Sequence, residues 1–413
     1  MYRQIDRCRI CGNRQLVEVL DLGAQALTGV FPKTRTQHVT VGPLKLVKCA
    51  GSVDACGLLQ LQHTYDLAEL YGENYGYRSG LNASMVAHLQ RKVQKILAGI
   101  KLSPGALVID VGANDSTTLR AFPAHEYILV GVDPTGDKFR SFYPEHVKLI
   151  PEFFSAETMQ KHLGCRKAMV ITSFSMFYDL EEPLKFMREI SEVLDDEGVW
   201  VSEQSYMPLM LRRNSYDTVC HEHLEYYALK QIKWMADRVG LKIVDVEFND
   251  VNGGSASVVL AKNRSSRSES PRVAEVLRSE EREGLDTLTP YEDFASRVAS
   301  SRSGLRRFLE AARRSGKMVS ALGASTKGNV LLQYCNITES DIAPVGEVNP
   351  DKFGAFTPGT LLPITSEGEM LAMMPDYLLV LPWHFRSSFL AQPKFTGRNL
   401  IFPLPELEVV CSA

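Results

Sequence analysis

The sequence predicts an α/β protein in which two Rossmann-like sheets follow a small cysteine-stapled lobe. Three observations predict this fold class. Two pairs of cysteines open the chain, apolar runs alternate with helical segments over residues 100–262, and a second alternation begins near residue 318. Because 413 residues are too many for one hydrophobic core, we expect two or three domains.

The composition limits the classes of partner. The formal charge of −3 offers no general attraction for nucleic acid. No stretch approaches the roughly 20 apolar residues that span a bilayer, and no signal peptide precedes Cys8. The scattered cysteines, among them Cys165 and Cys411, suit reduced thiols. We therefore expect no nucleic-acid or membrane partner and a cytoplasmic location.

The cysteine pairs predict a structural zinc site. The four candidate ligands are Cys8, Cys11, Cys49 and Cys56. Four thiolates at such spacing close a tetrahedral site and leave no open position for chemistry. Gly12 and Gly57 supply the permissive backbone that a metal knuckle needs. The wider spacing of the second pair leaves ordinary buried thiols as the alternative.

The central region reads as a doubly wound sheet. Continuous apolar runs predict strands at residues 106–111, 127–133, 168–173 and 199–202. A helix with one apolar face is expected over residues 85–97, and another over residues 184–194. Residues 242–262 predict two strands around Asn252-Gly253-Gly254, which form an antiparallel hairpin that closes the sheet.

A Ser- and Arg-rich segment at residues 264–271 is the clearest linker. A long charged helix is expected over about 290–315, and a second α/β unit begins at Met318 and includes a strand over 377–381. The expected domains are a zinc-binding lobe (1–65), a cofactor domain (66–265) and a C-terminal Rossmann-like domain (266–413).

Two turns of the central sheet carry adenosine-binding signals. Gly112 lets a ligand approach the backbone after the strand that ends at Asp110, and Asp133 ends the next strand, where it can accept hydrogen bonds from ribose hydroxyls. These signals alone do not separate S-adenosylmethionine from a nicotinamide. The reversed hairpin strand favours the sheet of a class I methyltransferase and therefore S-adenosylmethionine. The expected cofactor contacts are Asp110, Gly112, Asn114, Asp133, Phe154 and Ser173. A glycine-containing turn without a ligand is the alternative.

Residues 220–227 form the densest cluster of titratable side chains. His221 and His223 flank Glu222, and no third metal ligand stands at a suggestive spacing. A neutral histidine beside a carboxylate is a suitable base near pH 7. Surface histidines at a helix start are the alternative. The aromatic residues 174–180 belong either to a substrate pocket or to the core.

The second α/β unit carries an anion-binding pattern. Residues 323–329 follow a strand and open a helix, so that backbone amides and Lys327 face a ligand. Because the segment lacks Walker A spacing, it does not indicate nucleotide hydrolysis. It indicates a ligand that carries a diphosphate. Residues 382–386 end another strand at the same edge.

The chain resembles the nucleotide-sugar C-methyltransferases that make branched deoxysugars, over nearly its whole length. The segments that carry this resemblance are Cys8-x-x-Cys11, Leu20-Asp21-Leu22-Gly23, Tyr75-Gly76-Tyr77-Arg78-Ser79, Phe177-Tyr178-Asp179-Leu180, His221-Glu222-His223 with Tyr226-Tyr227, Gly253-Gly254-Ser255, residues 323–329 and Pro358-Gly359-Thr360. Two departures are Cys220, where some members have tyrosine, and Ser116, where many keep glycine.

The resemblance implies methylation at C3 of a 4-keto-6-deoxy sugar linked to TDP or GDP, by a monomer or weak homodimer. His223 is the implied base, Tyr75 or Tyr77 would stabilise the enolate, and Glu222 would orient the substrate or the base. The implied substrate contacts are Tyr178, His221, Ser325, Lys327, Asn329, His384 and Arg386. The alternatives are methylation at oxygen or nitrogen, and a non-catalytic zinc-bearing scaffold.

Overall fold

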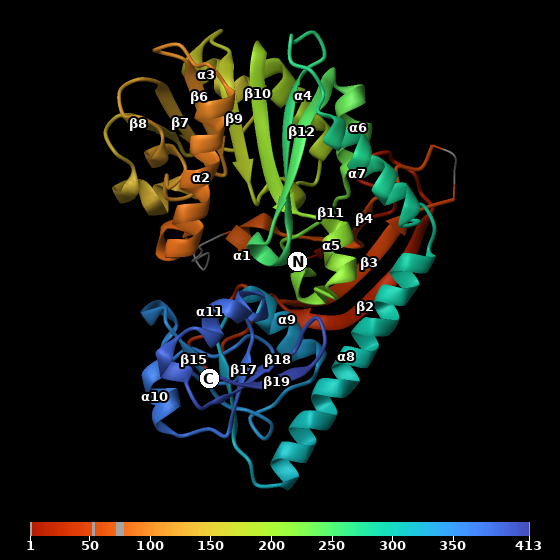
Figure 1. Cartoon of the computed structure of the whole chain (residues 1–413), viewed down its shortest axis with the longest axis vertical. Coiled ribbons are helices and arrows are strands. Elements are labelled where there is room, and N and C mark those ends of the chain that lie inside the picture. The colour runs from red at the N-terminus through yellow and green to blue at the C-terminus, as the bar shows by residue number, and fades with distance from the viewer. Residues whose placement is uncertain (1, 52–53, 72–77, 413) are drawn as a thin grey trace.

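The computed structural model describes residues 2–51, 54–71 and 78–412. Two large α/β units stand one above the other in Figure 1. The upper unit contains a seven-stranded sheet and the lower unit a six-stranded sheet. A four-stranded sheet lies at the junction between them, on the side along which the helix α8 (Thr289–Arg314) runs.

The four-stranded sheet belongs mainly to the N-terminal lobe. Its order is β11-β4-β3-β2, and the strands are β2 (Leu16–Ala26), β3 (Val41–Cys49), β4 (Leu59–Leu61) and β11 (Glu225–Tyr226). A separate pair, β1 (Tyr2–Gln4) and β5 (His63–Tyr65), precedes α1 (Leu67–Tyr71). Because β11 comes from the middle of the chain, the lobe and the central domain share a sheet.

The seven-stranded sheet has the order β12-β13-β10-β9-β6-β7-β8. Its strands are β6 (Leu107–Val111), β7 (Ile128–Val132), β8 (Val147–Ile150), β9 (Ala168–Phe174), β10 (Leu194–Ser205), β12 (Leu241–Asn249) and β13 (Ser255–Lys262). All neighbouring strands are parallel except at β13, which is antiparallel to both β10 and β12. The expected closing hairpin and its reversed strand are confirmed.

Helices cover both faces of this sheet. They are α2 (Ala83–Gly99), α3 (Ala156–Leu163), α4 (Pro183–Val193) and α6 (Leu229–Arg238), whereas α5 (Met207–Arg212) lies at the junction and packs on α8. On α4, Pro183 stands in the first turn, where a missing N–H costs nothing, and Phe186, Met187 and Ile190 are buried at helical spacing. The helices expected at 85–97 and 184–194 therefore form.

The C-terminal unit follows α7 (Pro271–Arg282) and α8 (Thr289–Arg314). Its sheet has the order β16-β15-β14-β17-β18-β19, parallel except for β19. The strands are β14 (Val319–Leu322), β15 (Ala343–Glu347), β16 (Ile364–Ser366), β17 (Tyr377–Val380), β18 (Asn399–Phe402) and β19 (Glu408–Cys411); the helices are α9 (Thr326–Tyr334), α10 (Glu367–Ala372) and α11 (Arg386–Leu390). The long helix and the second α/β unit are confirmed.

Short 3-10 turns connect several strands to the helices that follow. Those used below are η4 (Phe177–Asp179), η5 (Tyr216–Thr218), η6 (Val251–Gly253) and η8 (Trp383–Phe385). Each of the three large sheets lies within one of the three expected domain ranges, except for strand β11. The domain limits at residues 65 and 265 stay predictions. Within the described residues, no helix combines the length and apolar character required to cross a bilayer.

Candidate functional site

The four predicted zinc ligands meet in the N-terminal lobe. Their sulfur atoms all lie within 4.8 Å of one another. Cys8 Sγ is 3.5 Å from Cys56 Sγ, and Cys11 Sγ is 3.5 Å from Cys49 Sγ. Four sulfurs at 2.3 Å from a tetrahedral zinc ion are about 3.8 Å apart, so the donor set fits Zn²⁺. Gly12 and Gly57 both have a φ of +73°, which confirms the need for permissive backbone in the two knuckles.

The loop after β6 has the shape of a ligand-binding turn. Gly112 has a φ of +73°, and a Cβ atom there would lie 3.0 Å from the Met176 side chain. Asn114 and Ser116 also have positive φ values, 48° and 66°. This left-handed conformation favours glycine, and Ser116 adopts it at some cost in strain.

Asp133 fastens this loop to the end of β7. One carboxylate oxygen accepts from the Asn114 backbone N–H at 2.8 Å, and the other accepts from the Thr135 backbone N–H at 2.7 Å. The backbone N–H groups of Ser79 and Gly80 donate hydrogen bonds to the side chains of Asn114 and Asp115 in the same loop. Loop and carboxylate therefore form one structure at the carboxyl edge of the sheet, where ligands of open α/β sheets bind.

The other predicted cofactor residues lie deeper. Asp110 is buried and accepts a hydrogen bond from Thr172, and burial raises its pKa to about 7 despite that bond. The Ser173 hydroxyl accepts the indole N–H of Trp200 at 2.9 Å. The Phe154 ring packs on Phe186 with centroids 5.3 Å apart. Next to it, Phe153 is 64% exposed after β8, a ring that sequence analysis missed because the pair Phe-Phe does not reveal which ring points outward.

The titratable segment at residues 220–227, here called the histidine cluster, includes a strand of the four-stranded sheet of the lobe. Glu225 and Tyr226 form β11, which pairs with Gln60 and Leu59 of β4. Arg9, in the first zinc knuckle, lies 3.6 Å from the Glu225 carboxylate. The position of residues 221–224 therefore depends on the zinc-binding lobe, although the sequence separation gives no sign of it.

His223 has the geometry of a neutral base. Its Nδ1 lies 2.9 Å from the Thr218 carbonyl oxygen. A carbonyl can only accept, so Nδ1 carries the proton and Nε2 keeps a free lone pair. Burial, and after it the positive charge of Lys327, lower the pKa of His223 to about 3, against the opposing effect of the Thr218 carbonyl. The Tyr178 ring lies beside the imidazole, with centroids 4.3 Å apart.

Glu222 faces the end of the N-terminal strand β2. A Cβ atom at Gly29 would lie 2.7 Å from Glu222 Oε1, so a side chain at position 29 would displace the carboxylate. Burial raises the pKa of Glu222, and of Asp179, whose pKa the nearby Glu222 raises further. Two carboxyl groups are thus held toward the protonated form next to His223. Asp179 was not predicted as a site residue, although its motif was noted.

The C-terminal domain contributes Lys327 from the first turn of α9. Its Nζ donates to the Asn252 carbonyl in η6 at 2.7 Å, which connects this domain to the closing hairpin of the central sheet. Burial lowers the pKa of Lys327, and the charge of Asp217 opposes that effect. Ser325 is the N-cap, with its hydroxyl accepting from the Gly328 N–H at 3.1 Å. The amino end of α9 therefore faces the histidine cluster.

Other predicted substrate contacts have different partners. The ring of His221 is buried against Tyr65, with centroids 4.6 Å apart. Asn329 donates to the Thr28 carbonyl at 2.8 Å. Arg386 makes a bidentate ion pair with Glu408 at 3.1 and 2.9 Å. His384 remains close to the site, since its pKa is lowered to about 3 by burial and then by the charge of Lys327. Tyr75 and Tyr77 lie outside the described residues.

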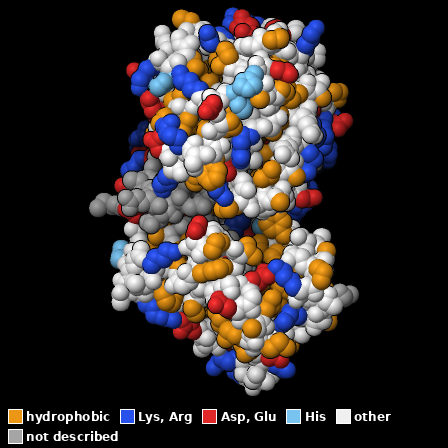
Figure 2. All heavy atoms as spheres, turned by 90° about the vertical axis from the view of Figure 1, so that its left-hand side faces the viewer, with side chains coloured by type: hydrophobic (Ala, Val, Ile, Leu, Met, Phe, Trp, Pro, Cys, Tyr) orange, Lys and Arg blue, Asp and Glu red, His pale blue; other side chains and the backbone are white. Residues whose placement is uncertain are grey.

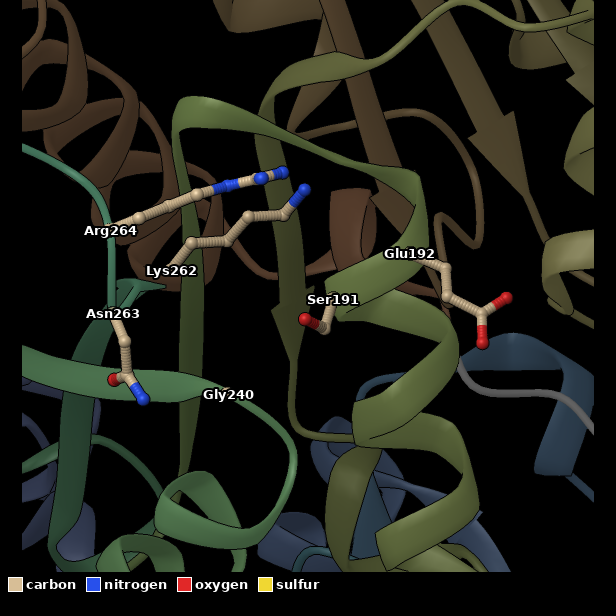
Figure 3. Close-up of a pocket in the computed structure, with 6 residues that line it drawn as sticks. All are labelled: Ser191, Glu192, Gly240, Lys262, Asn263 and Arg264. Carbon is tan, nitrogen blue, oxygen red and sulfur yellow. The ribbon is translucent and has the colours of Figure 1, made fainter.

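The site therefore lies where the three parts of the chain meet. Figure 2 shows the molecule narrowing between its upper and lower halves on the face that this view presents. A hollow of about 320 Å³ lies elsewhere and is formed by Lys262, Arg264 and their neighbours (Figure 3). It lies at the amino edge of the parallel strands, because Ala261 of β13 pairs with Val199 at the start of the parallel part of β10. It is thus on the opposite edge from the cofactor loop.

Comparisons with known proteins agree with this geometry. Three family profiles match: a zinc binding domain over residues 8–71, a methyltransferase domain over 84–246 and a C-methyltransferase C-terminal domain over 250–405. C-methyltransferase NovU of Streptomyces niveus is 30% identical over 417 residues, which covers 99% of this chain and 97% of the relative. The chain belongs to the C-methyltransferase family.

The solved structures are less similar to this C-methyltransferase than NovU is. The CcbJ methyltransferase from Streptomyces caelestis is 15% identical, with a TM-score of 0.33 over 42% of this chain and 89% of that one. Magnesium protoporphyrin IX methyltransferase from Synechocystis PCC 6803, with bound SAM, is 13% identical, with a TM-score of 0.32 over 43% and 79%. The fold assignment rests on the strand order and the family match.

The C-methyltransferase uses S-adenosylmethionine and a structural zinc ion. The glycine turn at Gly112 and the carboxylate of Asp133 suit an adenosyl ligand, since one permits close approach and the other accepts hydrogen bonds. The closed Cys₄ set suits a metal with no catalytic position.

Proposed function

We propose that this C-methyltransferase acts at C3 of a nucleotide-linked 4-keto-6-deoxy sugar, with His223 as the base. The observation that carries the proposal is the hydrogen bond between His223 Nδ1 and the Thr218 carbonyl, which leaves Nε2 unprotonated. A carbon next to a ketone loses a proton far more readily than an ordinary C–H, and a neutral imidazole with a free lone pair on Nε2 can accept that proton. Bound S-adenosylmethionine supplies the electrophilic methyl group for that carbon.

The groups around His223 suit the charge changes of proton removal. As C3 loses its proton to Nε2, negative charge develops on the ketone oxygen, and a protonated carboxyl group can donate a hydrogen bond to it. Glu222 and Asp179 have raised pKa values through burial and are candidates for that donor. Tyr75 and Tyr77 stay predictions for the same task.

The amino end of α9 supports the choice of a diphosphate-linked substrate. A helix amino terminus and a lysine attract phosphate. Lys327 also lowers the pKa of His223. An anion bound beside Lys327 would offset its charge and raise that pKa, so the imidazole becomes more basic when the sugar nucleotide is in place. This coupling favours a charged nucleotide sugar over a free keto sugar.

The substrate assignment is tested by product analysis. Purified enzyme, S-adenosylmethionine and a panel of TDP- and GDP-linked sugars are incubated, half of them 4-keto-6-deoxy sugars and half the matching 4-hydroxy sugars. We expect a mass gain of one methyl group, about 14 Da, in keto sugars alone, and NMR should place it on C3. Methylation of the 4-hydroxy sugars, or a methyl group on oxygen or nitrogen, would contradict the proposal.

A further inference from the structure

The turn η5 of the central domain lies against the C-terminal domain. The helix α9 packs on η5. The Tyr216 ring meets the Tyr334 ring edge-on at 5.4 Å, and the Tyr216 hydroxyl is 3.8 Å from Cys335 Sγ. All three residues of η5 are buried. The turn therefore cannot move without disturbing the interface with the C-terminal domain.

A second contact joins η5 to the C-terminal domain by a directed hydrogen bond. The indole Nε1–H of Trp383, in η8, donates to Asp217 Oδ2 at 2.8 Å. Both side chains are buried, and Asp217 Oδ1 has no hydrogen-bond partner among the described residues. A hydrogen bond to a buried carboxylate is strong, and its removal leaves that group unsatisfied. The Trp383 bond thus fixes Asp217 in position.

The next residue of η5 holds the base. The Thr218 carbonyl accepts from His223 Nδ1 at 2.9 Å and from the Tyr226 hydroxyl at 3.4 Å. The Thr218 hydroxyl donates to the Ser215 carbonyl at 2.8 Å, which holds the turn closed. The direction of the Thr218 carbonyl, and with it the tautomer of His223, is therefore set by the orientation of η5.

We propose that Trp383 and Asp217 are positioning residues, through which the C-terminal domain fixes the Nδ1–H tautomer of His223. The inference rests on the proposed role of His223 as base. It gives the C-terminal domain a second task beside ligand binding. Neither side chain was predicted as a site residue, since Asp217 lies in no motif and, of the segment at residues 382–386, only His384 and Arg386 were predicted.

The test reads the tautomer directly. ¹⁵N NMR of histidine-labelled enzyme, without sugar, distinguishes the two imidazole tautomers, and His223→Asn assigns the signal. We expect Nδ1–H in the native protein and in Trp234→Phe, a control that removes an indole N–H on α6. Trp383→Phe should give a mixture of tautomers and lower kcat about tenfold, with binding of S-adenosylmethionine unchanged.

Asp217 provides a second, independent variant. Asp217→Asn keeps an oxygen that can accept from Trp383 and should retain the tautomer, whereas Asp217→Ala should behave like Trp383→Phe. The double variant Trp383→Phe/Asp217→Ala should be no worse than either single variant, because both break one connection.

The outcomes separate this inference from the proposed function. Folded Trp383→Phe and Asp217→Ala proteins with an unchanged His223 signal would overturn the inference, whatever their activity. A changed tautomer supports it even if no keto sugar is methylated, since the NMR measurement uses no sugar. Absence of methylated product from the sugar panel would instead refute the proposed function alone.

Discussion

The electrostatics of single residues explain how a histidine can remain a free base inside the protein. The pKa of His223 is lowered to about 3 by burial and by Lys327. A histidine accepts a proton only when it is neutral, and a lowered pKa extends the neutral range toward acid. Activity should therefore not fall near the ordinary histidine pKa of about 6.5.

We expect Lys327→Met to move the acid limb of the kcat/KM profile, which reports the free enzyme, toward higher pH. The change removes one of the two influences that lower the pKa of His223, so the imidazole is protonated earlier as the pH falls. The measurement is kcat/KM from pH 3 to 8. Lys185→Met, at an exposed lysine on α4, is the control and should follow the native profile. An acid limb that stays in place in Lys327→Met would contradict this account of the base.

Gly29→Ala should reduce kcat, by about tenfold, because the added methyl group meets the Glu222 carboxylate at 2.7 Å and must displace it. Gly368→Ala is the matched control: its Cβ would meet nothing within 4 Å, and alanine on α10 should leave kcat unchanged and stabilise the protein by about 0.5–1 kcal/mol. Steady-state kinetics and thermal unfolding measure both effects. Native kcat in Gly29→Ala would show that the Glu222 position is unimportant.

At the residue scale, the sequence predicted what chemistry is present more successfully than which way side chains point. The cysteine set was predictable because metal ligands recur at typical spacings. His223 was selected by resemblance within a cluster of titratable residues, and its role as base stays a prediction. Arg386 and Asn329 stood in suggestive segments, yet one pairs with Glu408 and the other with Thr28. Such partners are distant in sequence and leave no local pattern.

At the scale of elements, the conformation of the loop after β6 depends on Asp133, at the end of β7. Asp133→Ala should weaken binding of S-adenosylmethionine at least about tenfold, since the loop loses its anchor at Asn114 together with an acceptor for the ligand. Calorimetric titration measures the affinity. Asp137→Ala, at an exposed carboxylate paired with Arg140, is the control and should bind normally. Equal affinity in both variants would remove Asp133 from the cofactor site.

We expect removal of zinc to disturb the proposed active site through strand β11. Because β11 pairs with β4 of the zinc-binding lobe, loss of the metal loosens residues 221–224 as the lobe loses folding free energy. With a strong chelator, Tm and activity should fall together, and added Zn²⁺ should restore both. Loss of turnover at an unchanged Tm would mean that the metal takes part in the reaction itself.

The order of elements was largely readable from the chain. Apolar runs identified β6, β7, β9 and β10 because buried parallel strands have no polar face. The glycines at 253 and 254 revealed the reversed strand that distinguishes this sheet. The pairing of β11 with β4 was not predicted, because two residues carry too little periodicity and their partner strand lies about 165 positions earlier.

For the whole molecule, the described structure brings three separate parts of the chain to one place. The lobe contributes Gly29 and supports β11, the central domain holds the cofactor loop and His223, and the C-terminal domain adds Lys327 and Trp383. A nucleotide sugar has separate diphosphate and keto-sugar ends, and a site built by two α/β domains can hold each end with a different domain.

The central claim is that His223 removes a proton from the sugar carbon before that carbon is methylated. The most direct measurement is hydrogen exchange at C3 of the keto-sugar nucleotide in D₂O, with S-adenosylhomocysteine bound so that no methyl group is transferred. The native enzyme should incorporate deuterium at C3, and His223→Asn should incorporate none while it still binds the cofactor product. Exchange at the native rate in His223→Asn would contradict the account.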